Sequence, residues 1–348
     1  MRKNMNLLFI VTLVSALLQF GIPGWSRAQT TDAPKSMVIV NGRAATSTFA
    51  LITGIAEMIK KHVGIKTVPE AGTFGRNVLL VHKKEAEFGM TNNDRAFFAA
   101  RGEDDYKPFG KLNVRLMFTS SHSPPFCFVT RRDANIRTVA ELKGKRVMCV
   151  YPGNPAFTKG ADIHFEAAGM TRKDVQAMSF SGHEEGDMAL KERRISAYIH
   201  PMPITSVMPY LQELNYEVPI RLLGAPKEKL EVVLTKYPYF RHDIVTAKIY
   251  GDLVDQKDLF SIGVAEALVC QSGLSEDLIY KVMKAIFEHL PELTTFTPIT
   301  RIWMGDPLSS AVLPYHPGAI RYYKEKKLWM DDLEKKQMQL MTEIGISK

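Results

Sequence analysis

Short apolar stretches and longer amphipathic stretches alternate along the chain. The apolar run 36–41 (SMVIVN) predicts a buried strand, and the segment 49–62 predicts a helix because Leu51, Ile55 and Ile59 recur at helical spacing. The same two patterns predict further strands at 66–69, 87–91, 114–120, 127–132, 146–150, 195–199 and 220–223, and further helices at 77–84, 138–143, 155–168, 184–194, 204–214 and from 275 onward. Such alternation is typical of an α/β protein with a largely parallel sheet.

Two segments interrupt this alternation and predict a division into two lobes. The segment 120–126 (SSHSPPF) contains two prolines, and the segment 261–270 (SIGVAEALVC) is an apolar run bounded by turn residues. Each fits a crossing of the chain from one lobe to the other. We therefore expect a discontinuous lobe I, formed by 36–123 and 262–348, and a lobe II formed by 124–261.

The N-terminal segment 1–28 has the features of a secretory signal peptide. Arg2 and Lys3 precede the apolar run 7–18, and the sequence SRA at 26–28 supplies small residues at the −3 and −1 positions of a cleavage site. A membrane anchor is the alternative, but the run is well short of the roughly 20 apolar residues that span a bilayer. No cysteine stands at the cleavage point, which disfavours a lipid-anchored form. We expect a periplasmic mature protein.

The charge of the chain argues against an extended nucleic-acid footprint. Lysine and arginine number 45 against 37 aspartates and glutamates, which gives a formal net charge of +8. Three of the cations lie in the predicted leader, so the mature chain carries 8 − 3 = +5. Charges of both signs are interleaved, with no run of five or six like charges. We therefore expect no nucleic-acid partner.

No sequence motif points to a metal site, a cofactor or an enzyme. The chain has no CxxC pair and no G-x-S-x-G, H-E-x-x-H, P-loop or G-x-G-x-x-G motif. Its three cysteines, Cys127, Cys149 and Cys270, lie in apolar runs, where they serve as small buried residues or where Cys127 and Cys149 form one bridge. We expect no metal, no cofactor and no catalytic residues, with a Ser/His pair formed only in the fold as the open alternative.

Polar or Gly/Pro-marked loops follow five of the predicted strands. These loops are 42–48, 70–76, 92–95, 152–158 and 200–203. In an α/β sheet, ligands collect beyond the carboxyl ends of the strands, where helix N-termini present free N–H groups. Each loop alone is ordinary loop chemistry, but their common location predicts a ligand site.

Four stretches of the sequence resemble one family of binding proteins. They are AELKGKRVMCVYPGNPAF at 140–157, LTKYPYF at 234–240, LSEDLIYKVMKAIFEHLPEL at 274–293 and LPYHPGAIRYYKEKKLW at 313–329. In order and spacing they are similar to the TAXI family, the solute receptors of tripartite ATP-independent periplasmic (TRAP) transporters. The HPGAIRYY part is the most specific, and the resemblance covers about 37–329.

The resemblance implies a type II periplasmic-binding-protein fold, in which two α/β lobes close on a small organic ligand at their hinge. It also implies delivery of this ligand to the membrane subunits of a TRAP transporter. We expect a monomeric receptor. A periplasmic sensor with the same fold is the alternative, and a secreted enzyme is a weaker one.

Candidate ligand contacts follow when the family's binding motifs are carried over onto the strand-end loops. The candidates are Arg43, Thr46, Ser47, Thr48, Phe49, Thr73, Phe74, Asn92, Asp94, Asn154, Phe157, Thr158, His200 and Met202. Structural roles compete with these assignments, because Asp94 and Asn154 are suited to capping helices and Phe49 and Phe157 to packing. The remaining alternatives are a solvated loop cation for Arg43 and a core or hinge position for His200 and Met202.

The chain departs from the family pattern in ways that bear on the ligand. Arg43 stands in a loop where the family is rich in glycine, so that a guanidinium replaces a nest of backbone amides. Phe74, Pro155 and Ala156 replace small or hydroxyl-bearing residues and add apolar surface. A larger or more aromatic carboxylate is compatible with these changes, and whether the altered first loop binds an anion stays open.

Overall fold

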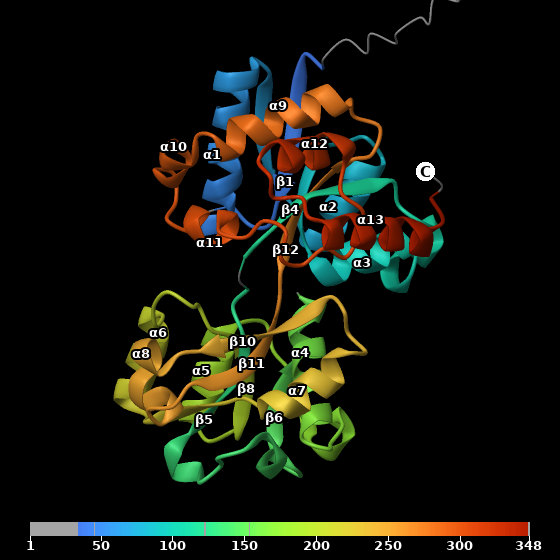
Figure 1. Cartoon of the computed structure of the whole chain (residues 1–348). Helices are drawn as coiled ribbons and strands as arrows, with labels where there is room; N and C mark the ends of the chain where they lie inside the picture. Colours follow the sequence, from blue (N-terminus) through green and yellow to red (C-terminus); the bar gives the residue numbers. More distant parts are fainter. Residues whose placement is uncertain (1–33, 45, 122, 153, 347–348) are drawn as a thin grey trace, which may run out of the picture. The chain divides into compact units, whose positions relative to one another are not determined.

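The structure of the protein is a computed structural model that describes residues 34–44, 46–121, 123–152 and 154–346. The predicted signal peptide lies outside the described residues. The described chain forms one compact unit with two sheets, each carrying its own helices. Figure 1 shows the blue-to-cyan and orange-to-red parts of the chain together in lobe I, and the green-to-yellow part in lobe II.

Lobe I is built on a five-stranded sheet with the order β2-β1-β3-β12-β4. Its strands are β1 (Ser36–Asn41), β2 (Lys66–Ala71), β3 (Phe88–Asn92), β4 (Val114–Thr119) and β12 (Glu266–Gln271). Strand β1 pairs in parallel with β2 and β3, whereas β12 is antiparallel to β3 and β4.

Lobe II is built on a seven-stranded sheet with the order β10-β11-β5-β8-β6-β7, and β9 pairs with β5 beside this path. Its strands are β5 (Phe126–Arg131), β6 (Arg146–Val150), β7 (Gln176–Ser179), β8 (Ala197–Pro201), β9 (Ile220–Leu223), β10 (Phe240–Val245) and β11 (Leu259–Val264). The chain therefore leaves lobe I after β4 and returns from β11 directly into β12.

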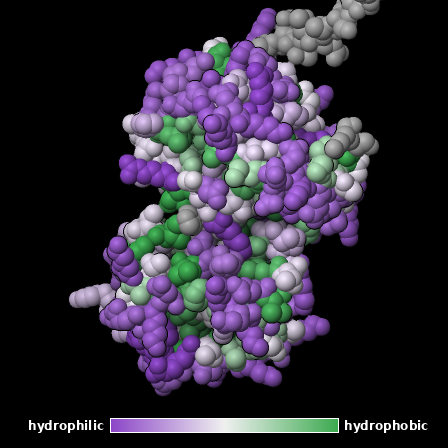
Figure 2. Space-filling model, in the orientation of Figure 1, coloured by the Kyte–Doolittle hydropathy of each residue, from purple (hydrophilic) through white to green (hydrophobic). Residues whose placement is uncertain are grey.

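Helices pack on both sheets. Those of lobe I are α1 (Ser47–Val63), α2 (Phe74–His82), α3 (Asn93–Arg101), α9 (Glu276–Phe287), α10 (Leu290–Thr294), α11 (Thr300–Met304), α12 (Pro317–Glu325) and α13 (Asp331–Ile344). Those of lobe II are α4 (Pro155–Ala167), α5 (His183–Lys191), α6 (Pro209–Glu217), α7 (Lys227–Leu234) and α8 (Ala247–Tyr250). On the face drawn in Figure 2, hydrophilic residues predominate, in agreement with the interleaved charges of the sequence.

Both sheets are mixed, so the expectation of a largely parallel sheet is wrong. In lobe I the exception is β12, and in lobe II the strands β5, β10 and β11 form antiparallel pairs. The double crossing between the lobes accounts for β5 and β12, whereas β10 and β11 are an antiparallel pair within lobe II. A strand that arrives from the other lobe enters at the edge where the neighbouring strands end, and it must run against them.

The structure modifies three other expectations. The helix predicted at 204–214 begins only at Pro209, because proline is suited to the first position of a helix, and 204–208 is irregular. The apolar run 261–270 is divided at Ala265 into the ends of two strands that belong to different sheets. The helix predicted at 138–143 is a single 3-10 turn, Val139–Leu142.

The HPGAIRYY sequence forms the start of α12 and its contact with α9. His316 caps the helix, since its Nδ1 accepts a hydrogen bond of 3.1 Å from the backbone N–H of Gly318, and its Nε2 lies 3.1 Å from the carbonyl oxygen of Leu274. At Gly318 the two helices approach so closely that a Cβ atom would lie 2.3 Å from the carbonyl oxygen of Glu276. The motif most specific to the sequence resemblance therefore has a packing role.

The three cysteines are free and buried. Burial raises the pKa of Cys127 and of Cys149 to about 12, and it also raises the pKa of Cys270. The thiols are therefore protonated at neutral pH and act as small core residues.

Candidate functional site

One candidate site is a cavity of about 500 Å³ at the place where the chain crosses between the lobes. We call it the central cavity. Lobe I contributes Ser47 and Thr48 from the first turn of α1 and the segment 297–303 around α11. Lobe II contributes residues 203–208, which follow β8, and the two crossings contribute Ser123 and Glu266. Because both lobes and both crossings line the cavity, a movement of one lobe relative to the other would change its shape.

Glu266 is the sole ionisable side chain among the described residues that line the central cavity. It is the first residue of β12, and its backbone is held by Ser120, whose N–H donates to the Glu266 carbonyl at 2.8 Å and whose Oγ accepts from the Glu266 N–H at 3.0 Å. Its carboxyl group forms no hydrogen bond or ion pair with the described part of the chain. Burial raises the pKa of this carboxyl to about 7.

A second cavity of about 390 Å³ lies between α3 and the start of α4, and it differs in charge. Here Asp94 and Arg95 are buried and paired at 3.1 Å, and Arg95 also contacts Asp104 at 3.0 Å. Across the cavity Arg172 pairs with Asp162 at 3.0 Å. Burial raises the pKa of Asp94 against the opposing effect of Arg95. Each acid in this paired set has an arginine partner, and Lys159 adds a further cation to the lining of the cavity.

Aromatic rings gather on lobe II beside the two cavities. The ring of Phe157 stacks on Tyr151 at 4.9 Å and meets His200 edge-on at 6.3 Å. The Nδ1 of His200 lies 3.0 Å from the hydroxyl of Tyr210. Burial, helped by the neighbouring His183, lowers the pKa of His200 to about 4. His200 is therefore neutral at pH 7 and belongs to an uncharged aromatic cluster.

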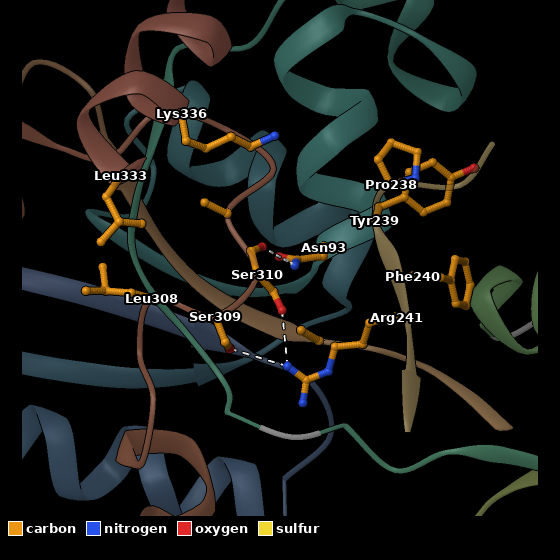
Figure 3. Close-up of a pocket in the computed structure, with 12 residues that line it drawn as sticks. Asn93, Pro238, Tyr239, Phe240, Arg241, Leu308, Ser309, Ser310, Leu333 and Lys336 are labelled. Carbon is orange, nitrogen blue, oxygen red and sulfur yellow. Dashed lines mark hydrogen bonds between the residues drawn. The ribbon is translucent and has the colours of Figure 1, made fainter. Parts of the chain in front are cut away.

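A third cavity, of about 340 Å³, lies beside a direct contact between the lobes (Figure 3). Arg241 of β10 turns toward Ser309 and Ser310 of lobe I, with its Nη1 3.3 Å and 3.2 Å from their hydroxyl oxygens. The other terminal nitrogen of Arg241 donates to the carbonyl oxygen of Ser121. Arg241 therefore ties β10 to lobe I at one side of the crossings.

The structure divides the residues predicted from the sequence among different surroundings. Ser47 and Thr48 line the central cavity, whereas Asp94 and Thr158 line the second one. The guanidinium of Arg43 is exposed, forms no hydrogen bond or ion pair with the described residues, and lines none of the three cavities.

The other candidates are placed outside the cavities. Thr46 caps α1, accepting from the N–H of Phe49 at 3.1 Å, and Asn154 caps α4, accepting from the N–H of Ala156 at 3.2 Å. The remaining ones are either packed or exposed next to the strand ends, namely Phe49, Thr73, Phe74, Asn92, Phe157, His200 and Met202. Met202 is 1% exposed, so a ligand would reach it only after rearrangement.

Three possible metal ligands lie on the surface of lobe I. His62, His289 and Glu292 offer atoms that are within 4.8 Å of one another. Glu292 is already paired with Lys61 at 2.7 Å, and the two imidazole rings are stacked at 3.5 Å. The competing lysine weakens the case for a cation at this position.

None of the described helices is long and apolar enough to cross a membrane.

Comparison with known proteins places the chain in a family. A model of the NMT1-like family matches residues 39–326. Among solved structures, the protein XAC2383 from Xanthomonas citri bound to chloride ion is 7% identical, with a TM-score of 0.50 over 90% of this chain and 98% of that one. The periplasmic aliphatic sulphonate binding protein SsuA from Escherichia coli is 11% identical, with a TM-score of 0.47 over 87% and 92% of the two chains. At these identities the similarity is one of fold, the two-lobe α/β fold of periplasmic binding proteins.

Proposed function

Since the chain belongs to the NMT1-like family, we propose that it is an extracytoplasmic solute-binding protein that captures a small organic ligand between its two lobes and delivers it to a membrane transporter. The observation that carries the proposal is the central cavity. Its volume of about 500 Å³ is typical of small-molecule sites, and both lobes and both crossings line it. A ligand bound there would contact both lobes and favour their closed arrangement.

The proposed partner is a membrane transporter of the TRAP type. The support comes from the four stretches that resemble TAXI receptors, together with the leader expected to direct the chain to the periplasm. Because β11 ends at Val264 in the sheet of lobe II, the proposed division joins 36–123 with 265–348 in lobe I and assigns 124–264 to lobe II, and each lobe offers its own surface to such a partner. Co-expression with the transporter subunits and uptake of a labelled ligand would test this assignment.

The proposed ligand contacts begin at the first turn of α1. Ser47 and Thr48 offer hydroxyl groups to the central cavity, and Trp303 and Met208 give it apolar walls. The ligand carboxylate expected from the sequence would pair with the guanidinium of Arg43. The backbone carbonyl of Arg43 accepts a hydrogen bond of 2.9 Å from Oγ1 of Thr46, the residue directly before Ser47 in the cavity lining. The ligand would then reach from the cavity toward the exposed loop.

Ligand binding is expected to raise the melting temperature. A ligand that binds only the folded state at about 100 times its dissociation constant adds about 2.7 kcal/mol to the free energy of unfolding. This shifts melting by several degrees, at roughly 2–4 °C per kcal/mol for a domain of 150–250 residues. The measurement is a fluorescence melting screen on protein that was unfolded and refolded to remove bound molecules, combined with mass spectrometry of the released fraction. No released small molecule and no shift with any compound would refute the proposed function.

Filling the central cavity is expected to weaken binding at least tenfold. Thr205 lines the cavity and is exposed, so Thr205→Trp places a large ring in the cavity at little cost to the apo fold. The matched control is Thr235→Trp, an exposed threonine of lobe II that lines none of the cavities described above. Affinity for the co-purified ligand is measured by calorimetry. Equal affinities of the two variants would move the site away from the central cavity.

A further inference from the structure

The backbone of Glu266 is held in place where the chain crosses between the lobes. The two backbone hydrogen bonds with Ser120 fix one side of the residue, and Glu266 lies opposite Asn92 in the pairing of β12 with β3. These contacts join the two crossings, which are 146 residues apart in the sequence. The side chain lines the central cavity, and its backbone is anchored in the sheet of lobe I.

Among the described residues that line the cavity, none carries a basic side chain that would balance this carboxylate. The lining residues of α1, of the loop after β8 and of the crossings carry hydroxyl or apolar side chains, and the neighbouring strands place Asn92 and Thr119 beside β12. In the segment 297–303 the single charged residue is Arg301, which is exposed and does not line the cavity. The raised pKa of Glu266 has burial as its sole cause, with no contribution from a charged neighbour.

An unpaired carboxylate in such a cavity disfavours some ligands and favours others. A ligand carboxylate placed there would add a second negative charge to a partly dehydrated site, which is unfavourable. A protonated nitrogen would form a charge-assisted hydrogen bond with Glu266 and find further acceptors in the hydroxyls of Ser47 and Thr48.

We propose that the ligand carries a protonated nitrogen, an ammonium or amidinium group on an apolar body, and that this group pairs with Glu266 in the central cavity. The proposal rests on the proposed solute-binding function and names the chemical class of its ligand. The proposed pairing with Glu266 does not depend on whether the ligand also carries a carboxylate that pairs with Arg43. Glu266 is then the residue that selects for positive charge.

The experiment compares ligands that share a skeleton and differ in charge. The probes are phenethylamine, tryptamine, putrescine, agmatine and choline, each with the neutral alcohol and the carboxylate of closest shape, titrated by calorimetry alongside the co-purified molecule. We expect the bound compounds to be cations, with the alcohol and carboxylate counterparts at least tenfold weaker. Glu266→Gln should weaken the cations ten- to a hundredfold, whereas Glu57→Gln, at an exposed position of α1, should leave them unchanged.

The dependence of affinity on pH gives a second readout. The cation needs an ionised Glu266, so affinity should fall about tenfold for each pH unit below 7 in the wild type and stay flat in Glu266→Gln. The proposal of a cationic ligand would be overturned if only neutral molecules or anions bound, or if Glu266→Gln left the affinities unchanged. Either result would leave the proposed solute-binding function intact. A protein that binds no probe and releases no small molecule would overturn both proposals.

Discussion

Acidification from pH 7 to pH 4 is expected to destabilise the wild-type protein by about 3 kcal/mol relative to its His316→Asn variant. Burial lowers the pKa of His316 from 6.5 to about 4, and one pKa unit corresponds to about 1.4 kcal/mol. The folded state binds this proton less tightly than the unfolded state. Stability from this group is therefore complete above pH 6.5 and declines as the pH falls toward 4.

Asparagine is the suitable replacement because it caps helices well and does not titrate. It keeps an acceptor for the N–H of Gly318 and loses the contact with Leu274, so the variant starts somewhat less stable at pH 7. Urea unfolding followed by circular dichroism at pH 7, 6, 5 and 4 gives the difference. The control, His242→Asn, changes an exposed histidine of β10. Parallel curves for wild type and His316→Asn would show that His316 titrates normally.

Replacing Gly318 by alanine is expected to destabilise the protein by about 3 kcal/mol or more. The new methyl group would lie 2.3 Å from the carbonyl oxygen of Glu276 and 2.8 Å from the Cβ of Ile279. Both obstacles belong to α9 and cannot rotate away, so α12 must move and its packing is lost. Overpacking of this kind typically costs 1–3 kcal/mol, and a backbone obstacle places it at the upper end.

Gly75→Ala is the matched control because Gly75 and Gly318 are both the second residue of a helix. A Cβ atom at Gly75 would meet its nearest neighbour, the hydroxyl of Tyr106, at 3.6 Å, which is an ordinary contact. Alanine is the better helix former, so this variant should be neutral or up to about 1 kcal/mol more stable. Thermal unfolding of the three proteins decides the matter. Similar melting temperatures for both variants would exclude a close approach of α12 and α9 at Gly318.

Periodicity and capping residues predict much of the fold. The strand at 36–41 has the predicted bounds, and the cap at Asn154 is confirmed by a hydrogen bond to a backbone N–H group. These features depend on neighbours in the sequence. The direction of β12 depends instead on where the chain re-enters lobe I, which no local pattern records. For the same reason the run 261–270 gives no sign that it serves two sheets.

The candidate site is less accessible to sequence reasoning. Strand-end loops correctly indicate Ser47 and Thr48 as cavity residues, but assignment by loop alone cannot separate the central cavity from the second one, which holds Asp94 and Thr158. Glu266 was missed because it begins a strand within an apolar run and does not lie in a polar strand-end loop. The available signal was a single acidic residue within ten otherwise apolar or small positions, a residue that must be paired, protonated or functional.

The return of the chain into β12 also sets the order in which the protein assembles. Closing the contact between Ser120 and Glu266 in an unfolded chain means closing a loop of 146 residues, and the entropy cost of closure grows with loop length. Once β5 and β11 are paired through Phe126 and Ile262, only the short segments 120–126 and 262–266 remain to be closed by this contact. Lobe II, whose strands lie within one continuous stretch, should therefore fold first. Lobe I then completes its sheet last, by admitting β12 between β3 and β4.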